Sequence, residues 1–225
     1  MWSAVLAARE ADTPHALQAL ERLARAYWRP LYIFLRQRGR DHETAAEEVQ
    51  GFFEHLLSRD FLRFVRPREG KFRTFLLSSF TRWLNDQGDR ARAAKRGGGR
   101  ALISLDEFDS VRELVQPAGD TPEESFDRRW AREIFDRAMQ LVAGAWSERA
   151  QVFTALRPVI SGETMTDDYA TIGARLGMSE GAVKKAAFDL RALFAKKIRE
   201  EIRLTVRDDA AVDEELRYLI RLLRQ

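Results

Sequence analysis

The residues from Tyr169 to about Phe194 have the types and the spacing that contact duplex DNA. Gly177 lies where the chain between two helices must turn in a left-handed conformation, and Ser179 follows it as a helix cap. In a helix-turn-helix, the start of the second helix reaches base edges in the major groove while basic side chains bind phosphates. The outward face of that second helix, which we predict to bind DNA, carries Ser179, Glu180, Gly181, Lys184, Lys185, Phe188 and Arg191.

An ordinary helical hairpin with a solvated charged face is the alternative interpretation of this segment, because two helices joined by a glycine are common. The run of residues 177–184 combines a turn glycine, a capping serine and a basic residue, and this combination favours DNA binding over the alternative. The residues spaced to pack the two helices together are Ile172, Leu176, Met178, Val183 and Leu190.

A second candidate for nucleic-acid binding is the basic and aromatic segment from Lys71 to Arg96. Aromatic side chains can stack on unpaired bases while arginines bind the backbone. Phenylalanines at helical spacing more often belong to a core, so Phe75, Leu76 and Phe80 are assigned to the core. The residues expected on the nucleic-acid face are Lys71, Arg73, Thr74, Arg82, Trp83, Asn85, Asp86, Arg90, Arg92, Lys95 and Arg96.

Helical periodicity runs through nearly the whole chain and predicts an all-α fold. We expect two helical domains joined by a flexible acidic linker, the second domain containing the helix-turn-helix. Consecutive glycines at 97–99 cannot hold a helix and mark the first boundary. The expected parts are a domain at 1–98, a linker at 99–122, a domain at 123–205 and a C-terminal amphipathic helix at 206–225. The expected helices span about 15–38, 42–57, 71–92, 121–143, 147–158, 169–176, 179–204 and 212–223.

The C-terminal helix carries an apolar stripe that needs a partner surface. Packing within the chain and a regulatory role are both open at this point, and simple packing is the more common outcome. The stripe consists of Val212, Leu216, Leu219, Ile220 and Leu223.

The composition limits the kinds of site that the chain can hold. Its 225 residues contain no cysteine, which excludes disulfides and thiolate metal sites, and its three histidines lie apart, so no cofactor or metal is expected. No apolar run is long enough to span a membrane, and residues 1–9 lack a basic leader and a cleavage site. We expect a cytoplasmic protein without a membrane partner.

Catalytic groupings are also missing from the pattern. The adjacent acids Glu47 and Glu48 point apart on a helix, and so do Asp167 and Asp168. The glycines at 97–99 lack the lysine and hydroxyl residue of a phosphate-binding loop. We expect no enzymatic activity.

Taken together, the motifs resemble the extracytoplasmic-function (ECF) group of the sigma-70 family of bacterial RNA polymerase sigma factors. Residues 27–36 are similar to the opening of sigma region 2, and residues 41–57 are similar to its polymerase-binding helix. Residues 71–92 are similar to the helix that opens and reads the minus-ten element, and residues 169–197 to the region 4 helix-turn-helix that reads the minus-thirty-five element. The resemblance covers roughly residues 16–203.

The resemblance implies a subunit that binds the clamp and the flap of core RNA polymerase, recognises promoter DNA and helps to melt it. The loop after Trp83 would capture a flipped base of the non-template strand. The helix at 42–57 departs from the family pattern, because an alanine stands at one usually acidic position in residues 44–48. The implied polymerase contacts are Glu43, Glu47, Glu48, Gln50 and Phe53.

Other partners and one other function remain open. The resemblance allows an anti-sigma factor or a Ser/Thr kinase as a partner, and phosphorylation of Thr44 or Ser58 would supply the missing negative charge. The alternative function is a stand-alone helix-turn-helix regulator that binds duplex DNA without polymerase, its first domain serving for ligand binding or dimerisation. Duplex binding in the absence of polymerase distinguishes the two.

Overall fold

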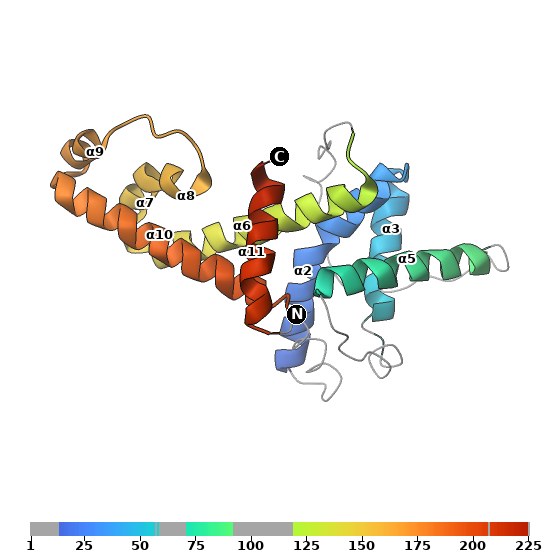
Figure 1. The fold of residues 1–225 in the computed structure, drawn as a ribbon. Helices are drawn as coiled ribbons and strands as arrows, with labels where there is room; N and C mark the ends of the chain where they lie inside the picture. Colours follow the sequence, from blue (N-terminus) through green and yellow to red (C-terminus); the bar gives the residue numbers. More distant parts are fainter. Residues whose placement is uncertain (1–13, 57, 59–70, 92–118, 207, 225) are drawn as a thin grey trace. The chain divides into compact units, whose positions relative to one another are not determined.

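The computed structural model describes residues 14–56, 58, 71–91, 119–206 and 208–224, which are mostly helical and contain no strand. This confirms the all-α fold for the described part of the chain (Figure 1). The helices are α2 (Pro14–Gln37), α3 (His42–Leu56), α5 (Phe72–Ala91), α6 (Pro122–Ala145), the 3-10 turn η2 (Ser147–Arg149), α7 (Ala150–Leu156), α8 (Pro158–Ser161), α9 (Tyr169–Leu176), α10 (Glu180–Arg203) and α11 (Ala210–Arg224).

Most helix boundaries agree with the expected ones, and the exception is the helix predicted at 147–158. That segment is divided into η2 and α7, whereas its predicted end near Pro158 agrees with the structure, in which the separate helix α8 begins at this residue. Proline has no backbone N–H, so it interrupts the hydrogen-bond ladder of the preceding helix.

The chain divides into two compact units, residues 1–133 with 203–225 and residues 134–202. These limits differ from the expected domains, because the first part of α6 and all of α11 belong with α2, α3 and α5. The expected boundary near residue 98 and most of the expected linker at 99–122 lie outside the described residues.

The core of the first unit is built from aromatic side chains of α2, α3 and α5. Phe52 of α3 lies 4.8 Å from Phe80 of α5 between ring centroids, and Tyr27 of α2 meets Phe72 edge-on at 5.4 Å. Such tilted and edge-on pairs are the favoured aromatic geometries. From α6, Phe126 and Trp130 complete this core.

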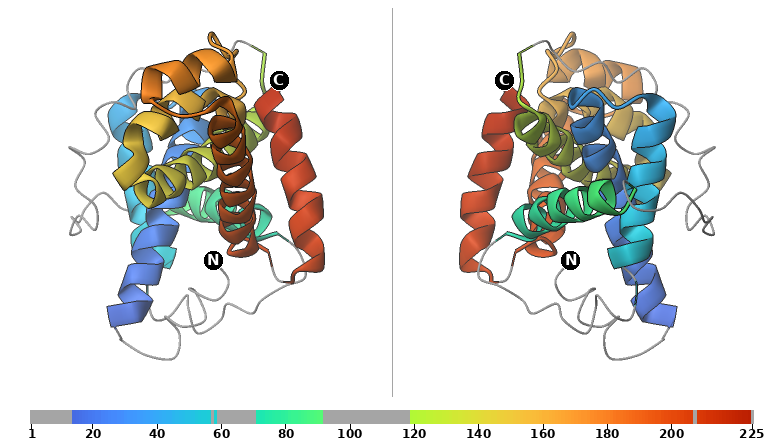
Figure 2. Two further views of the ribbon diagram at one scale, coloured as in Figure 1. Left: turned by 90° about the vertical axis from the view of Figure 1, so that its left-hand side faces the viewer. Right: turned by 90° about the vertical axis from the view of Figure 1, so that its right-hand side faces the viewer.

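Helix α11, drawn in red in Figure 2, belongs to the same unit, and one of its faces is buried. The buried residues are Val212, Glu215, Leu219 and Leu222, whereas Ile220 of the predicted stripe is 39% exposed. The buried face of α11 is therefore rotated about the helix axis relative to the predicted apolar stripe, and it includes Glu215.

The start of α6 has a reciprocal capping box. The backbone N–H of Thr121 donates to Glu124 Oε2 at 2.8 Å, and the N–H of Glu124 donates back to Thr121 Oγ1 at 3.2 Å. The Thr121 hydroxyl also donates to Glu124 Oε2 at 3.0 Å, and this bond and the one from the Thr121 N–H lower the pKa of Glu124. Helix α6 begins at Pro122, so its predicted start is confirmed. Proline is favoured in the first turn because the missing N–H has no partner there.

In the second unit, α9 and α10 pack on the helices before them. The fully buried residues Ile172, Val183 and Leu190 belong to its core, and Leu176 and Met178 pack partly buried against it. These residues are those whose spacing predicted the packing of the two helices.

The turn between α9 and α10 is fixed by backbone hydrogen bonds. Gly177 has φ +65°, and the N–H of Met178 donates to the carbonyl of Gly173 at 2.8 Å, as in a Schellman motif. A Cβ placed on Gly173 would lie 2.6 Å from the Met178 carbonyl oxygen. The close return of the chain over α9 therefore requires a glycine at position 173.

We predict that Gly173→Ala destabilises the second unit by about 1–3 kcal/mol, because the methyl group meets a rigid backbone oxygen. Hydrogen exchange of the α9 and α10 amides measures the loss. The matched control is Gly144→Ala in α6, whose added Cβ meets nothing within 4 Å. This control should leave protection unchanged or raise it slightly. Equal protection in both variants would contradict the account of the turn.

Candidate nucleic-acid interface

The outward face of α10 presents every residue predicted to contact duplex DNA. Ser179, Glu180, Gly181, Lys184, Lys185, Phe188 and Arg191 are all exposed. Phe188 is 70% exposed, which is unusual for a phenylalanine in a helix packed on its other face.

Local interactions hold this face in place. The carboxylate of Asp168 caps α9 by accepting from the N–H of Thr171 at 2.8 Å, and this hydrogen bond lowers the pKa of Asp168. The hydroxyl of Ser179 accepts from the N–H of Ala182 at 3.2 Å, as predicted for the cap of α10. The first turns of both helices are thus capped by the residues that directly precede them.

The two lysines of this face form ion pairs at the surface. Lys184 Nζ lies 2.6 Å from Glu180 Oε1, and Lys185 Nζ lies 2.8 Å from Asp189 Oδ2. The hydrogen bond to Glu180 raises the pKa of Lys184, which stays charged. Exposed ion pairs contribute little to stability, so phosphate oxygens can replace these partners.

Arg191 and Tyr169 connect the two helices at the edge of this face. Arg191 Nη2 donates to the Tyr169 hydroxyl at 3.3 Å. Tyr169 was missing from the predicted site. Tyr169 is the first residue of the capped helix α9 and contacts a basic residue of α10. This position is the signal that could have identified it.

Helix α5 exposes part of the second predicted face. Thr74, Arg82, Asn85 and Asp86 are exposed. Arg92, Lys95 and Arg96 lie outside the described residues, as does the side chain of Arg90.

Trp83 lies within α5, half-buried against α3, and the helix continues to Ala91, so the loop expected after Trp83 is wrong. Its ring stacks on Phe80 with centroids 6.3 Å apart and meets Phe52 edge-on at 5.9 Å. A Cβ on Gly51 would lie 3.2 Å from the Trp83 ring, so the glycine of α3 makes room for the indole. The surrounding aromatic rings fix the orientation of Trp83.

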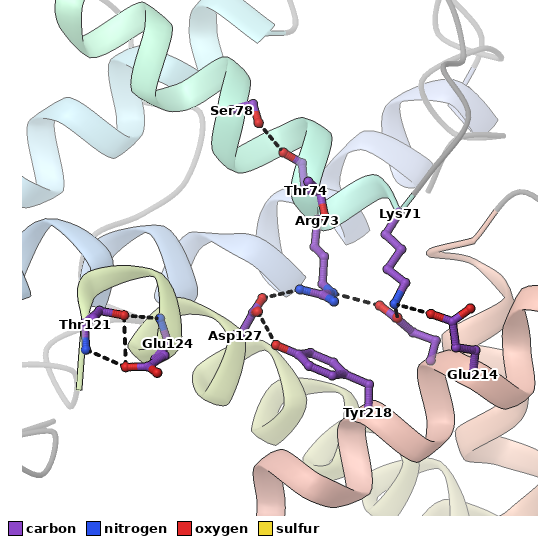
Figure 3. A network of polar contacts seen from close by, with 10 residues as sticks. Lys71, Arg73, Thr74, Ser78, Thr121, Glu124, Asp127, Glu214 and Tyr218 are labelled. Atoms are coloured by element: carbon purple, nitrogen blue, oxygen red, sulfur yellow. Dashed lines mark hydrogen bonds and ion pairs between the residues drawn. The ribbon is translucent and has the colours of Figure 1, made fainter. Parts of the chain in front are cut away.

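Arg73 is a correction to the predicted face, because only 8% of it is exposed. Its Nε donates to Glu215 Oε1 at 2.8 Å, and its Nη1 pairs with Asp127 (Figure 3). The guanidinium carbon also lies 4.4 Å from the ring centroid of Tyr218. Arg73 is a buried structural cation in this state.

Lys71 joins the same cluster at the start of α5. Its Nζ lies 2.8 Å from Glu215 Oε2 and 3.1 Å from Glu214 Oε1 (Figure 3). The hydroxyl of Tyr218 donates to Asp127 Oδ2 at 2.5 Å, which links α11 to α6. The Arg73 cluster, as we call it, consists of Lys71, Arg73, Asp127, Glu214, Glu215 and Tyr218.

The electrostatics of the Arg73 cluster keep its arginine charged. Burial alone would lower the pKa of Arg73, but the hydrogen bond to Glu215 and the charge of Asp127 raise it above its ordinary value. Burial and the hydrogen bond to Asp127 raise the pKa of Tyr218 to about 12.

The sequence contains a signal for the buried Glu215. It lies three residues after Val212 and four before Leu219, and a glutamate within an apolar stripe indicates a buried partner.

Helix α3 presents part of the predicted polymerase-binding surface. Glu43 and Glu47 are exposed, and Glu48 is partly exposed and accepts from Arg40 Nε at 3.0 Å. Gln50 is partly buried and donates to Glu54 at 3.3 Å.

Phe53 is a second correction. It is 2% exposed and packs on Phe52 with ring centroids 5.9 Å apart. Its place in the core follows from the spacing of the apolar residues of α3, so it is not available as a surface contact.

Comparisons with protein-family models, with curated proteins and with solved structures found no match. Among the described residues, none of the helices is long and apolar enough to cross a membrane. Within the same residues no group of three histidine, cysteine or acidic side chains is placed to hold a metal ion.

We predict that Arg73→Ala destabilises the first unit by about 3–5 kcal/mol, because buried Glu215 loses its cation. Urea unfolding followed by circular dichroism measures the loss. Arg82→Ala is the matched control, since Arg82 is exposed on the same helix, and its stability should be unchanged. Equal stability of the two variants would contradict a structural role for Arg73.

Proposed function

We propose that the chain is a promoter-specificity subunit of bacterial RNA polymerase, of the type found in the ECF sigma factors. The outward face of α10 is the observation that carries this proposal. A helix whose start is capped and whose exposed face combines Ser179, Lys184 and Phe188 suits insertion into a DNA groove. The hydroxyl is suited to a base edge, the ammonium group to phosphate, and the aromatic ring to an apolar contact such as a thymine methyl.

The absence of a side chain at Gly181 supports the same use of α10. A Cβ at this position would meet nothing within 4 Å, so the glycine is not required by packing inside the protein. It leaves the first turn of α10 free of bulk on the outward face. A phosphate or a base edge can then approach the helix start, where backbone N–H groups favour an anion.

The exposed polar residues in the second half of α5 support contact with an unpaired strand. Arg82, Asn85 and Asp86 are exposed within one turn of the half-buried Trp83, whose ring is held by Phe80 and Phe52. A fixed aromatic ring beside amide and guanidinium groups suits the capture of a single base. This is the chemistry that strand separation at a promoter requires.

The acidic side of α3 supports docking on a larger protein. Glu43 and Glu47 extend into solvent while Val49, Phe52 and Phe53 anchor the opposite side of the helix in the core. A rigid helix with exposed carboxylates is complementary to a basic surface. In the proposed function that surface is the clamp of the polymerase.

We predict that replacing both Lys184 and Lys185 by alanine weakens binding to a duplex that carries the upstream promoter element. Loss of two phosphate contacts should lower the slope of log affinity against log salt by about 1–2. Fluorescence anisotropy at several salt concentrations measures this slope, with the protein bound to core polymerase.

The control for this prediction is Lys196→Ala. Lys196 is an exposed lysine of the same helix, about three turns beyond Lys185. We expect a smaller change in its slope. A double variant with the native slope would show that α10 does not bind phosphates.

A further inference from the structure

We infer that α11 is an autoinhibitory cover over the start of α5. Its residues Glu214, Glu215 and Tyr218 occupy the positions that a nucleic-acid strand would take on Lys71 and Arg73, and release of α11 opens these cations to single-stranded nucleic acid. The inference rests on the proposed function, because that function supplies the nucleic acid that Lys71 and Arg73 would bind.

The groups that α11 supplies resemble those of a nucleic acid. Glu215 Oε1 accepts a hydrogen bond from Arg73 Nε at 2.8 Å, and Glu215 Oε2 forms an ion pair with Lys71 Nζ at 2.8 Å, as phosphate oxygens do with such cations. The aromatic ring of Tyr218 lies 4.4 Å from the Arg73 guanidinium carbon and 5.4 Å from Lys71 Nζ, as a base does when it stacks on a cation. A nucleic-acid strand and α11 therefore compete for the same cations.

The charge of the Arg73 cluster opposes a second anion while α11 is in place. Two cations, Lys71 and Arg73, face the three carboxylates of Asp127, Glu214 and Glu215 (Figure 3). Removal of α11 withdraws two of those carboxylates and leaves Asp127 alone with both cations. The local charge then changes from negative to positive, which favours a phosphate backbone.

The attachment of α11 allows it to separate as one helix. Its apolar contacts come from Val212, Leu219 and Leu222 along a single face, and most of its other residues are exposed or partly exposed. The N–H of Phe72 donates to the carbonyl of Thr205 at 3.1 Å, so the chain is tied to the start of α5 just before α11 begins. Elements held along one face open with a lower free energy than the core of a domain.

A thiol-labelling experiment tests the opening of α11 directly. The chain has no cysteine, so Leu219→Cys introduces a single thiol at a position that is 1% exposed. Ile220→Cys is the matched control, on the same helix at a position that is 39% exposed. We expect slow labelling of Leu219→Cys by a maleimide dye and fast labelling of Ile220→Cys.

Addition of a fluorescein-labelled single-stranded DNA 20-mer should accelerate labelling of Leu219→Cys and leave that of Ile220→Cys unchanged. The reason is linkage, since a ligand that binds only the open form must raise its population. Unchanged labelling of Leu219→Cys at a saturating concentration of the bound 20-mer would overturn the inference.

A milder release variant keeps the test independent of folding defects. Glu214→Gln with Tyr218→Phe weakens the hold on Lys71 and Asp127 but keeps Glu215 beside Arg73. We expect an affinity for the 20-mer about fivefold higher than that of the native chain. The gain should disappear when Lys71→Ala is added, and Glu148→Gln, which changes the net charge equally at an exposed position of η2, should show no gain.

The outcomes separate the inference from the proposed function. Duplex binding that depends on Lys184 and Lys185, together with no gain in the release variant, rejects the cover and keeps the proposed function. Failure of every protein to bind either duplex or the 20-mer, with core polymerase present, rejects both. A gain in the release variant that persists with Lys71→Ala also overturns the inference.

Discussion

A buried arginine determines how the first unit is assembled. Arg73 lies at the start of α5 with 8% of its surface exposed, and a guanidinium in such a place needs carboxylates close by. One comes from Asp127 of α6 and the other from Glu215 of α11. The pairing therefore ties together three stretches that are far apart in the sequence. It also explains why the last helix of the chain belongs to the same unit as the first ones.

The second unit depends on a steric constraint instead of a charge. Gly173 leaves space for the carbonyl of Met178, and the left-handed Gly177 directs the chain into α10. Both glycines act within a few residues of the helix that they position. The exposed face of α10 thus follows from local geometry, which is why its residues could be chosen from the sequence.

Helix limits and caps, which depend on neighbouring residues, were predicted from the sequence. Burial that depends on a partner far along the chain was missed. The limits of α9 and the cap of α10 depend on neighbouring residues such as Asp168 and Ser179, and both were predicted. Arg73 looked like a surface cation because its partner Glu215 is 142 positions away. Phe53 was assigned to a surface by resemblance, although the apolar spacing of α3 placed it in the core. The helix expected at 147–158 ends near Pro158 as predicted, but its division into η2 and α7 was not predicted.

The proposed role of this chain in directing RNA polymerase to promoters is best examined by transcription from a randomised promoter library. Core polymerase from the source cell would transcribe the library with and without the protein, and the transcribed templates would be sequenced. We expect two enriched sequence blocks at a constant spacing, lost when Glu47→Lys and Glu48→Lys are introduced on the side of α3 that faces solvent. No enrichment with the native chain, or a single inverted repeat bound without polymerase, would contradict it.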